Sequence, residues 1–260
     1  TPGNMTDALA AVAADAVTAA GDYLAARFEA GLDADYTATD VKTAADHEAE
    51  RRVIERVRAA YPDHPITAEE SGHHDGDGQY RWVVDALDGT NNFAAGVPTF
   101  GSVATAVDEA GPATTAVHVP VLDDLYVATR DGGVTHNGTE VAATDGDSVP
   151  LSHATVGTLI GPDVIHSEAR MDEFDAVADS VETECKRVIR CWAPVVYFGL
   201  LARGRLDGFV CFHPPEREQV AGDLLAREAG CVERTAGALT VFGRDEDLTE
   251  RLWTAAVDAL

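Results

Sequence analysis

The sequence predicts an α/β protein made of two halves, an α+β half over residues 1–145 and an α/β half over residues 146–260. In the first half, two long segments carry apolar residues at helical spacing. Short apolar runs separated by turn sequences follow them, which is typical of a sheet. Past residue 145, strand-like runs alternate with helical segments, and this alternation indicates a layered α/β domain.

The elements of the first half are predicted from the period of its apolar residues. Helices are expected over residues 5–30 and 46–60, and Pro62 ends the second. The polar, glycine-rich stretch "GHHDGDGQ", residues 72–79, predicts a loop. The strands that follow are expected at residues 81–85, 101–107, 114–119 and 124–129, with turns within residues 131–138.

The second half is predicted as three strand–helix pairs. In chain order, the strands are expected at residues 154–160, 186–190 and 206–212, and the helices that follow them near 167–180, at 194–203 and at 216–230. Gly230 closes the last helix. The border between two such halves is a common place for a cleft that binds a small molecule.

Composition narrows the classes of partner. Of the 260 residues, 45 are Asp or Glu and 19 are Lys or Arg, and the formal net charge is -26. Binding to nucleic acid or to an anionic membrane needs the opposite sign, so neither is expected. We interpret the acidic excess as adaptation to high salt. With no apolar run of 18 residues, no basic-then-apolar leader and no C-x-x-C pair, a cytoplasmic protein with reduced thiols is expected.

The stretch "WVVDALDGTNNF", residues 82–93, ends an apolar strand on two carboxylates, Asp85 and Asp88. Two ionised carboxylates at one place repel each other unless a cation lies between them. Mg²⁺ takes carboxylates together with substrate phosphate, and the carbonyl of Leu87 is a further candidate ligand. The string therefore predicts a site for divalent cations.

The residues behind these acids suit a phosphate. If a helix starts there, its first N–H groups are unpaired and its dipole is positive at that end. A phosphate on the N–H groups of Gly89 and Thr90 would also touch the cations. D-G-T alone is a common turn, but the full string with further acids indicates metal-assisted hydrolysis of a phosphate ester.

The string also carries a resemblance. "EES", residues 69–71, followed by "WVVDALDGTNNF" resembles the inositol monophosphatase family, one of the lithium-sensitive, magnesium-dependent phosphatases that include fructose-1,6-bisphosphatase. Ala86 stands where the family has proline. "DVKTAADHEAE", "HNG" and "REAG" also match, so the resemblance covers residues 5–245. It implies a layered α-β-α-β-α sandwich, two or three Mg²⁺ ions and a homodimer.

The resemblance implies a role for each matching residue. Glu69 would be a metal ligand, Asp85 would bridge two metals, and the Leu87 carbonyl and Asp88 would complete the set. Its implied catalytic and phosphate-binding residues are Glu69, Asp46, Gly89 and Thr90. In that scheme Thr90, paired with Asp46, orients and helps deprotonate the attacking water, while Gly89 and Thr90 hold the phosphate.

The last metal carboxylate departs from the family pattern. The family has W-D-x-A-A-G, and counting back ten residues from Glu228 lands on Glu218, with Arg217 in place of the Trp. A shift of one residue would put Gln219 there instead. We prefer Glu218 as the ligand, although an acid at a helix start is also favoured without any metal.

The substrate wall departs too. Trp192 and Ala193 match a stretch of small residues that contacts the sugar ring in the family, and Cys211 stands where many members have an acid. We therefore expect Trp192, Ala193 and Cys211 to line the substrate. The leading hypothesis is a Mg²⁺-dependent phosphatase for inositol monophosphate or a fructose-1,6-bisphosphate-like ester. The alternatives are a nucleotide-type ester, such as 3′-phosphoadenosine or NADP, and a non-catalytic relative that binds phosphate or metal.

Overall fold

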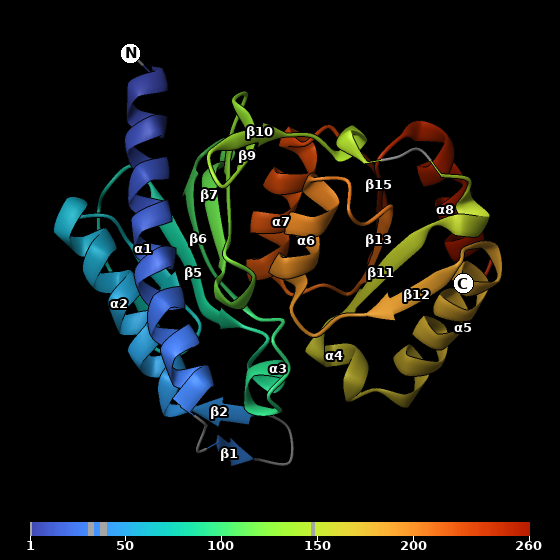
Figure 1. The fold of residues 1–260 in the computed structure, drawn as a ribbon, viewed down its shortest axis with the longest axis horizontal. Helices are drawn as coiled ribbons and strands as arrows, with labels where there is room; N and C mark the ends of the chain where they lie inside the picture. Colours follow the sequence, from blue (N-terminus) through green and yellow to red (C-terminus); the bar gives the residue numbers. More distant parts are fainter. Residues whose placement is uncertain (1, 31–33, 37–40, 147–148) are drawn as a thin grey trace.

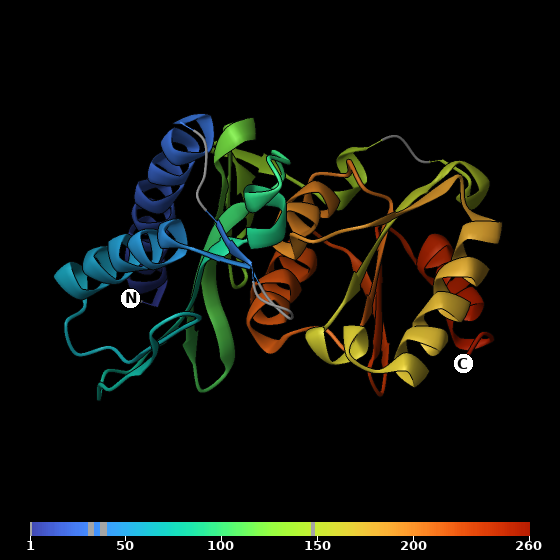
Figure 2. The same ribbon diagram turned by 90° about the horizontal axis from the view of Figure 1, so that it is seen from below.

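The computed structural model describes residues 2–30, 34–36, 41–146 and 149–260 of the chain. Its strands form an eight-stranded sheet in the N-terminal half, a five-stranded sheet in the C-terminal half and a small two-stranded sheet. Figure 1 shows the two large sheets side by side, with helices α6 and α7 between them. Seen from below, in Figure 2, the same two helices again separate the sheets.

The bounds of the described elements are as follows. The helices are α1 Pro2–Ala30, α2 Ala44–Ala60, α3 Thr90–Ala94, α4 Pro162–Ile165, α5 Glu168–Glu184, α6 Pro194–Ala202, α7 Glu216–Glu228 and α8 Glu246–Val257. The strands are β1 Ala34–Tyr36, β2 Val41–Thr43, β3 Ile66–Ala68, β4 Gly72–His74, β5 Arg81–Asp88, β6 Gly101–Asp108, β7 Gly111–Val119, β8 Asp124–Thr129, β9 Gly133–His136, β10 Thr139–Val141, β11 Thr155–Ile160, β12 Arg187–Arg190, β13 Gly208–Phe212, β14 Val232–Ala236 and β15 Leu239–Gly243.

The predicted α-β-α-β-α layering is confirmed. The first sheet has the order β10-β9-β8-β7-β6-β5-β3-β4 and the second the order β12-β11-β13-β15-β14. Helices α1 and α2 cover the outer face of the first sheet, and α5 and α8 cover the outer face of the second (Figure 1). Apolar side chains in three clusters fill the spaces between these layers, because each sheet buries both of its faces.

Helix α1 is long and apolar enough, by length and composition, to be a candidate membrane span. Its apolar stripe is already buried in this fold, however. Leu9, Val17 and Leu24 have no exposed surface and belong to the core cluster that also contains residues of α2 and of the first sheet. The apolar character of α1 is therefore explained by its place in the core.

Several elements differ from the sequence prediction. Residues 133–136 lie in a region predicted as turns, but they form strand β9, which pairs with β8 and β10. The stretch predicted as a loop begins with a strand, because Gly72–His74 pairs antiparallel with Ile66–Ala68. Such a short edge strand is held by backbone hydrogen bonds, so its side chains need no alternating pattern. Strand β5 continues to Asp88 rather than ending at Asp85. Finally, β14, β15 and α8 add a further hairpin and helix after Gly230.

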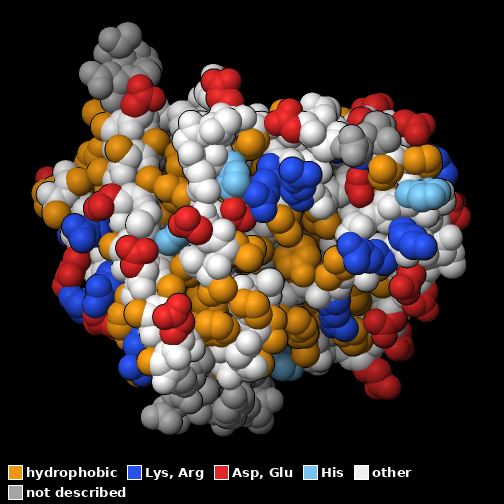
Figure 3. Space-filling model, viewed as in Figure 1, with side chains coloured by type: hydrophobic (Ala, Val, Ile, Leu, Met, Phe, Trp, Pro, Cys, Tyr) orange, Lys and Arg blue, Asp and Glu red, His pale blue; other side chains and the backbone are white. Residues whose placement is uncertain are grey.

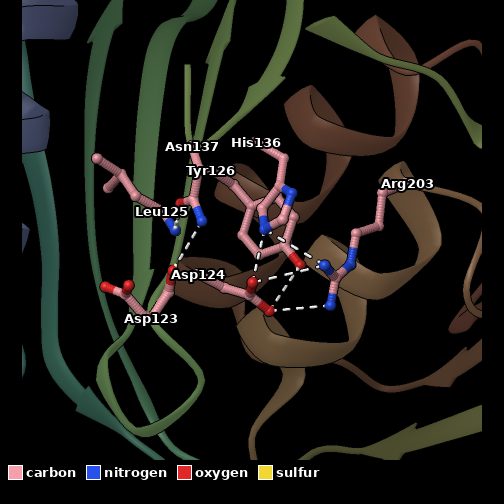
Figure 4. Close-up of polar contacts among 7 residues, drawn as sticks. All are labelled: Asp123, Asp124, Leu125, Tyr126, His136, Asn137 and Arg203. Atoms are coloured by element: carbon pink, nitrogen blue, oxygen red, sulfur yellow. Dashed lines mark hydrogen bonds and ion pairs between the residues drawn. The ribbon is translucent and has the colours of Figure 1, made fainter. Parts of the chain in front are cut away.

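A polar cluster joins the two halves away from the acidic string (Figure 4). Asp124 of β8 is buried and accepts hydrogen bonds from Arg203, just after α6, at 2.9 Å and from Tyr126 at 3.3 Å. His136 of β9 contacts the other oxygen of the same carboxylate. Since Arg203 belongs to the C-terminal half and its partners to the N-terminal half, this cluster adds polar contacts between the two halves to the apolar core that they share. On the face of the molecule drawn in Figure 3, several Lys and Arg side chains lie next to apolar side chains.

Candidate metal centre

The end of strand β5 is irregular, and this irregularity brings its two acids together. Asp85 pairs with Val103 and Asp88 with Gly101, so three steps along β5 match two along β6. Side chains three residues apart point to opposite faces of a regular strand, and one extra residue returns them to the same face. The hydroxyl of Ser102 donates to the carbonyl of Ala86 at 2.7 Å, which satisfies a backbone acceptor within the bulge.

Three buried carboxylates meet at this point. Asp85, Asp88 and Glu218 each offer an oxygen within 4.8 Å of the others. Asp85 accepts the N–H of Leu87 at 3.0 Å, and Asp88 accepts the N–H of Val195, in the first turn of α6, at 2.8 Å. Glu218 comes from the first turn of α7. The three carboxylates therefore come from one strand of the first half and one helix of the second, and α6 supplies a backbone donor to Asp88.

The charges of this group fit a divalent cation. Burial first, and then the neighbouring carboxylates of Glu69, Asp88 and Glu218, raise the pKa of Asp85 well above its ordinary value. Burial and the charge of Glu218 likewise raise the pKa of Asp88. Oε2 of Glu218 is buried without a hydrogen-bond partner among the described residues. A hard cation with oxygen ligands would satisfy this oxygen and remove the repulsion.

Glu69, the other predicted side-chain ligand, lies beside these three carboxylates but is not one of the group whose oxygens all lie within 4.8 Å of one another. It accepts a hydrogen bond from Nη2 of Arg217 at 3.0 Å, and 36% of its side chain is exposed. Burial raises the pKa of Glu69, while the charge of Arg217 and a hydrogen bond with Asp85 act to lower it. In this structure Glu69 is thus paired with an arginine while remaining in contact with Asp85.

Glu50 is a positioning residue that the sequence analysis missed. It is buried, and its carboxylate accepts the N–H groups of Glu70 at 2.7 Å and of Ser71 at 2.8 Å. The segment that carries Glu69 is therefore tied to α2. Asp46 and Glu50 lie four residues apart on that helix and share a face. Two acids at this spacing beside the apolar residues of α2 are the signal that could have identified Glu50.

Thr90 and Asp46 are in contact, as the resemblance implies. The hydroxyl of Thr90 lies 3.0 Å from Oδ1 of Asp46 and 3.0 Å from the carbonyl of Leu87, so two acceptors share its one proton. Gly89 precedes α3 with φ of 90°, a left-handed conformation that favours glycine. A Cβ at Gly89 would also lie 2.8 Å from the Cβ of Ala193. Both features require glycine at this position.

The three residues predicted to line the substrate differ in how far they are exposed to solvent. Trp192 is 43% exposed, and the guanidinium of Arg190 lies 5.6 Å from the centre of its ring. Ala193 is fully buried against Gly89. Cys211 has no exposed surface and belongs to the core between the two sheets, so the structure does not bring it to the solvent side of the site.

Of the two residues considered for the last ligand position, Glu218 has its carboxylate beside those of Asp85 and Asp88. The amide nitrogen of Gln219 instead donates to Asp223, one turn further along α7. Helix geometry accounts for the difference, because neighbouring side chains on a helix point about 100° apart.

Comparison with known proteins gives a consistent result. The sequence pattern of the inositol monophosphatase family matches residues 5–255. Nus factor SuhB of Vibrio cholerae is 29% identical over 226 residues, which are 85% of this chain and 82% of that protein. Nus factor SuhB of Pasteurella multocida is 31% identical over 225 residues, which are 84% and 82% of the two chains.

Solved structures show the same fold. Extragenic suppressor protein suhB from Bartonella henselae superposes with a TM-score of 0.87 at 23% identity, covering 97% of this chain and all of that one (100%). Inositol monophosphatase from Anabaena (Nostoc) superposes with a TM-score of 0.82 at 25% identity, covering 97% of this chain and 96% of that one. With a family match over residues 5–255 and this fold, the chain belongs to the inositol monophosphatase family.

Proposed function

We propose that this chain hydrolyses a small phosphate monoester in a Mg²⁺-dependent reaction. The observation that carries the proposal is the group of three buried carboxylates, Asp85, Asp88 and Glu218, within reach of one cation. Those three would hold the metal, with Glu69 and the carbonyl of Leu87 as further ligands if two or three ions bind. A buried oxygen of Glu218 without a described partner supports a bound cation over an empty acidic cluster.

The chain's own residues would position the ester and move the proton. Bound Mg²⁺ supplies positive charge for the phosphoryl group and lowers the pKa of water from about 15.7 toward about 7. Thr90 Oγ1 would accept a proton from the attacking water while its own proton passes to Asp46, 3.0 Å away. The N–H groups of Gly89 and Thr90 would hold the phosphate, since phosphoryl transfer needs positioning and neutralised charge.

The substrate that we propose is inositol monophosphate or a fructose-1,6-bisphosphate-like ester. The family supports this choice, but the wall of the site differs from the family pattern at Trp192 and Cys211. Because Cys211 is fully buried, a ring hydroxyl would need another partner. The exposed ring of Trp192 offers a surface on which a base could stack, which supports a nucleotide-type ester as the alternative.

The test is release of inorganic phosphate at high KCl, with and without Mg²⁺, from a panel of inositol, sugar and nucleotide phosphates. We expect release that requires Mg²⁺, and the preferred ester would identify the substrate class. Asp88→Asn is the matched control, because it removes one carboxylate charge and keeps the shape of the side chain. If no ester is hydrolysed while Mg²⁺ binding is measured directly, the phosphatase proposal is wrong.

A second candidate function is that of a non-catalytic family member, which would bind phosphate or metal without hydrolysing an ester. Curated relatives of similar length are named Nus factor SuhB, and Arg217, Glu218 and Trp192 depart from the family pattern. The expectation that no nucleic acid binds therefore rests on the net charge of -26 alone. We further infer that the protein is a cytoplasmic homodimer suited to high salt. Sedimentation in KCl would test the oligomeric state at high salt.

A further inference from the structure

Arg217 makes the ion pair that distinguishes this site from a plain acidic pocket. Its Nη2 donates to Oε1 of Glu69 at 3.0 Å, and it lies next in sequence to Glu218. The charges of Glu69, Glu218 and Asp85 all act on its guanidinium. Arg217 is therefore a permanent positive charge that faces the same carboxylates that a metal would use.

Among the described residues, the guanidinium of Arg217 has a hydrogen-bond partner at Nη2 and none at Nε. Nε of Arg217 is buried and has no hydrogen-bond partner in the described part of the chain. A planar guanidinium that serves as a permanent structural anchor usually has most of its donors satisfied. The single bond to a half-exposed carboxylate, together with the unsatisfied Nε, indicates that this arrangement can be exchanged for another.

Space for a second position lies next to the ion pair. A pocket of about 200 Å³ is lined by Arg217 together with Thr67, Pro215 and Glu216. Arg81 lines it as well, so it already holds one positive charge, which the carboxylate of Glu216 opposes. A guanidinium that leaves Glu69 thus has both room and an alternative acceptor close by.

We propose that Arg217 is a built-in counter-ion that competes with Mg²⁺ for Glu69, so that recruiting Glu69 to the metal displaces Arg217 toward this pocket. The inference rests on the metal site of the proposed function. Its physical basis is that a Mg²⁺ ion bound to Glu69 would lie beside the guanidinium of Arg217, and two cations side by side repel each other. Arg217 would then set the Mg²⁺ concentration at which Glu69 is engaged.

The test is direct binding of Mg²⁺ by isothermal titration calorimetry at fixed KCl. Arg217→Gln keeps a hydrogen-bond donor but removes the charge, and we expect its apparent Kd for Mg²⁺ to fall by about 5- to 150-fold, the usual range for coupled sites. Arg217→Lys keeps the charge and is expected to stay near the wild type. Arg130→Gln, which breaks the pair with Asp108, is the matched control for loss of one positive charge.

A double-mutant cycle locates the effect. In a Glu69→Gln background, Arg217→Gln should no longer tighten Mg²⁺ binding, because the shared carboxylate is gone. In EDTA, Arg217→Gln should also lower the melting temperature more than Arg217→Lys does, and excess Mg²⁺ should remove that difference. Both results would support competition at Glu69.

Failure of the competition can be distinguished from failure of the metal site itself. If the wild type binds Mg²⁺ through Asp88 and Arg217→Gln binds it equally or more weakly, the competition is wrong and the metal site stands. If neither protein binds Mg²⁺, the metal site of the proposed function is itself wrong, and this inference is overturned with it.

Discussion

The end of strand β5 and the start of helix α7 supply carboxylates to the same site, but they are held very differently. On β5, backbone N–H groups donate to both Asp85 and Asp88. On α7, three consecutive residues each keep a buried polar atom without a partner in the described chain: Nε of Arg217, Oε2 of Glu218 and Oε1 of Gln219. Each acid on the strand side therefore has a backbone donor, whereas the helix side keeps buried polar atoms without a described partner.

This difference coincides with how closely each region follows the family pattern. The β5 string departs at one position, Ala86, whereas the α7 segment departs at both Arg217 and Glu218. A buried polar group left without a hydrogen bond costs about 1–3 kcal/mol. Such costs are tolerated where a ligand later satisfies the group. We therefore expect α7 to be the side that adjusts when a cation binds, with β5 as the frame that keeps its position.

Asp88→Asn gives the largest expected effect and tests whether the acids of β5 bind the catalytic metal. It removes one of the three charges that converge on the cation, so Mg²⁺-dependent hydrolysis should fall by at least about 100-fold, as for changes at metal centres. Steady-state phosphate release measures this, and circular dichroism checks that the fold is kept. Turnover within tenfold of the wild type would mean that β5 does not bind the catalytic metal.

Thr90→Val tests the proton route with a side chain of nearly the same shape. Loss of the hydroxyl that contacts Asp46 should lower kcat by about 10²–10⁴-fold, the usual contribution of a positioned acid–base group. Thr90→Ser keeps the hydroxyl and should retain most of the activity. Equal rates for the Val and Ser variants would exclude Thr90 from the proton transfer.

Glu218→Asp tests whether helix α7 supplies a metal ligand. Shortening the side chain restores the acid of the family pattern, so turnover should be kept or raised, within about tenfold, and its dependence on Mg²⁺ concentration should shift, because Mg²⁺ prefers near-ideal octahedral geometry. The Mg²⁺ dependence of turnover measures it. Should neither turnover nor Mg²⁺ dependence change, Glu218 would be removed from the site, and its buried oxygen would need another explanation.

Metal-free protein should lose stability as the pH rises. The pKa values of Asp85 and Asp88 are raised in the folded state, which therefore binds protons more tightly than the unfolded chain does. Their contribution is fully present below the unfolded value of about 3.9 and is lost as the pH rises through the folded values.

Melting temperatures in EDTA across this range measure the effect. The decline should be smaller in the Asp85→Asn/Asp88→Asn double variant, which lacks the two titrating groups, and smaller in the wild type with saturating Mg²⁺. Parallel declines in all three samples would show that the general charge of the surface, and not this pair, controls the pH dependence.

The smallest effect on activity is expected at the cluster between the halves. Arg203→Gln breaks an ion pair with the buried Asp124 and should lower the free energy of unfolding by about 1.5–3 kcal/mol, as for hydrogen bonds to charged groups. Phosphate release should change little, because Arg203 follows the end of α6 opposite to Val195, which contacts Asp88. Chemical denaturation measures the stability, and a loss of turnover comparable to that of Asp88→Asn would place this cluster in the active machinery.

The sequence determined the local features of this protein. Helical periodicity predicted α1 and α2, and alternating strands and helices predicted most of the C-terminal half, because both patterns are set by neighbours in the chain. It also predicted Asp85 and Asp88 as one site. It did not predict β4, whose pairing depends on a partner strand, or the hairpin and helix after Gly230.

Only the tertiary structure decided which distant groups meet. The bulge that turns Asp85 and Asp88 to one face depends on the register with β6. The meeting of Glu218 with Asp85 and Asp88, the pairing of Glu69 with Arg217 and the burial of Cys211 depend on how the two halves pack. Sequence spacing fixes chemistry within a turn or a strand, whereas contacts between residues more than 100 positions apart follow from packing, which no local pattern encodes.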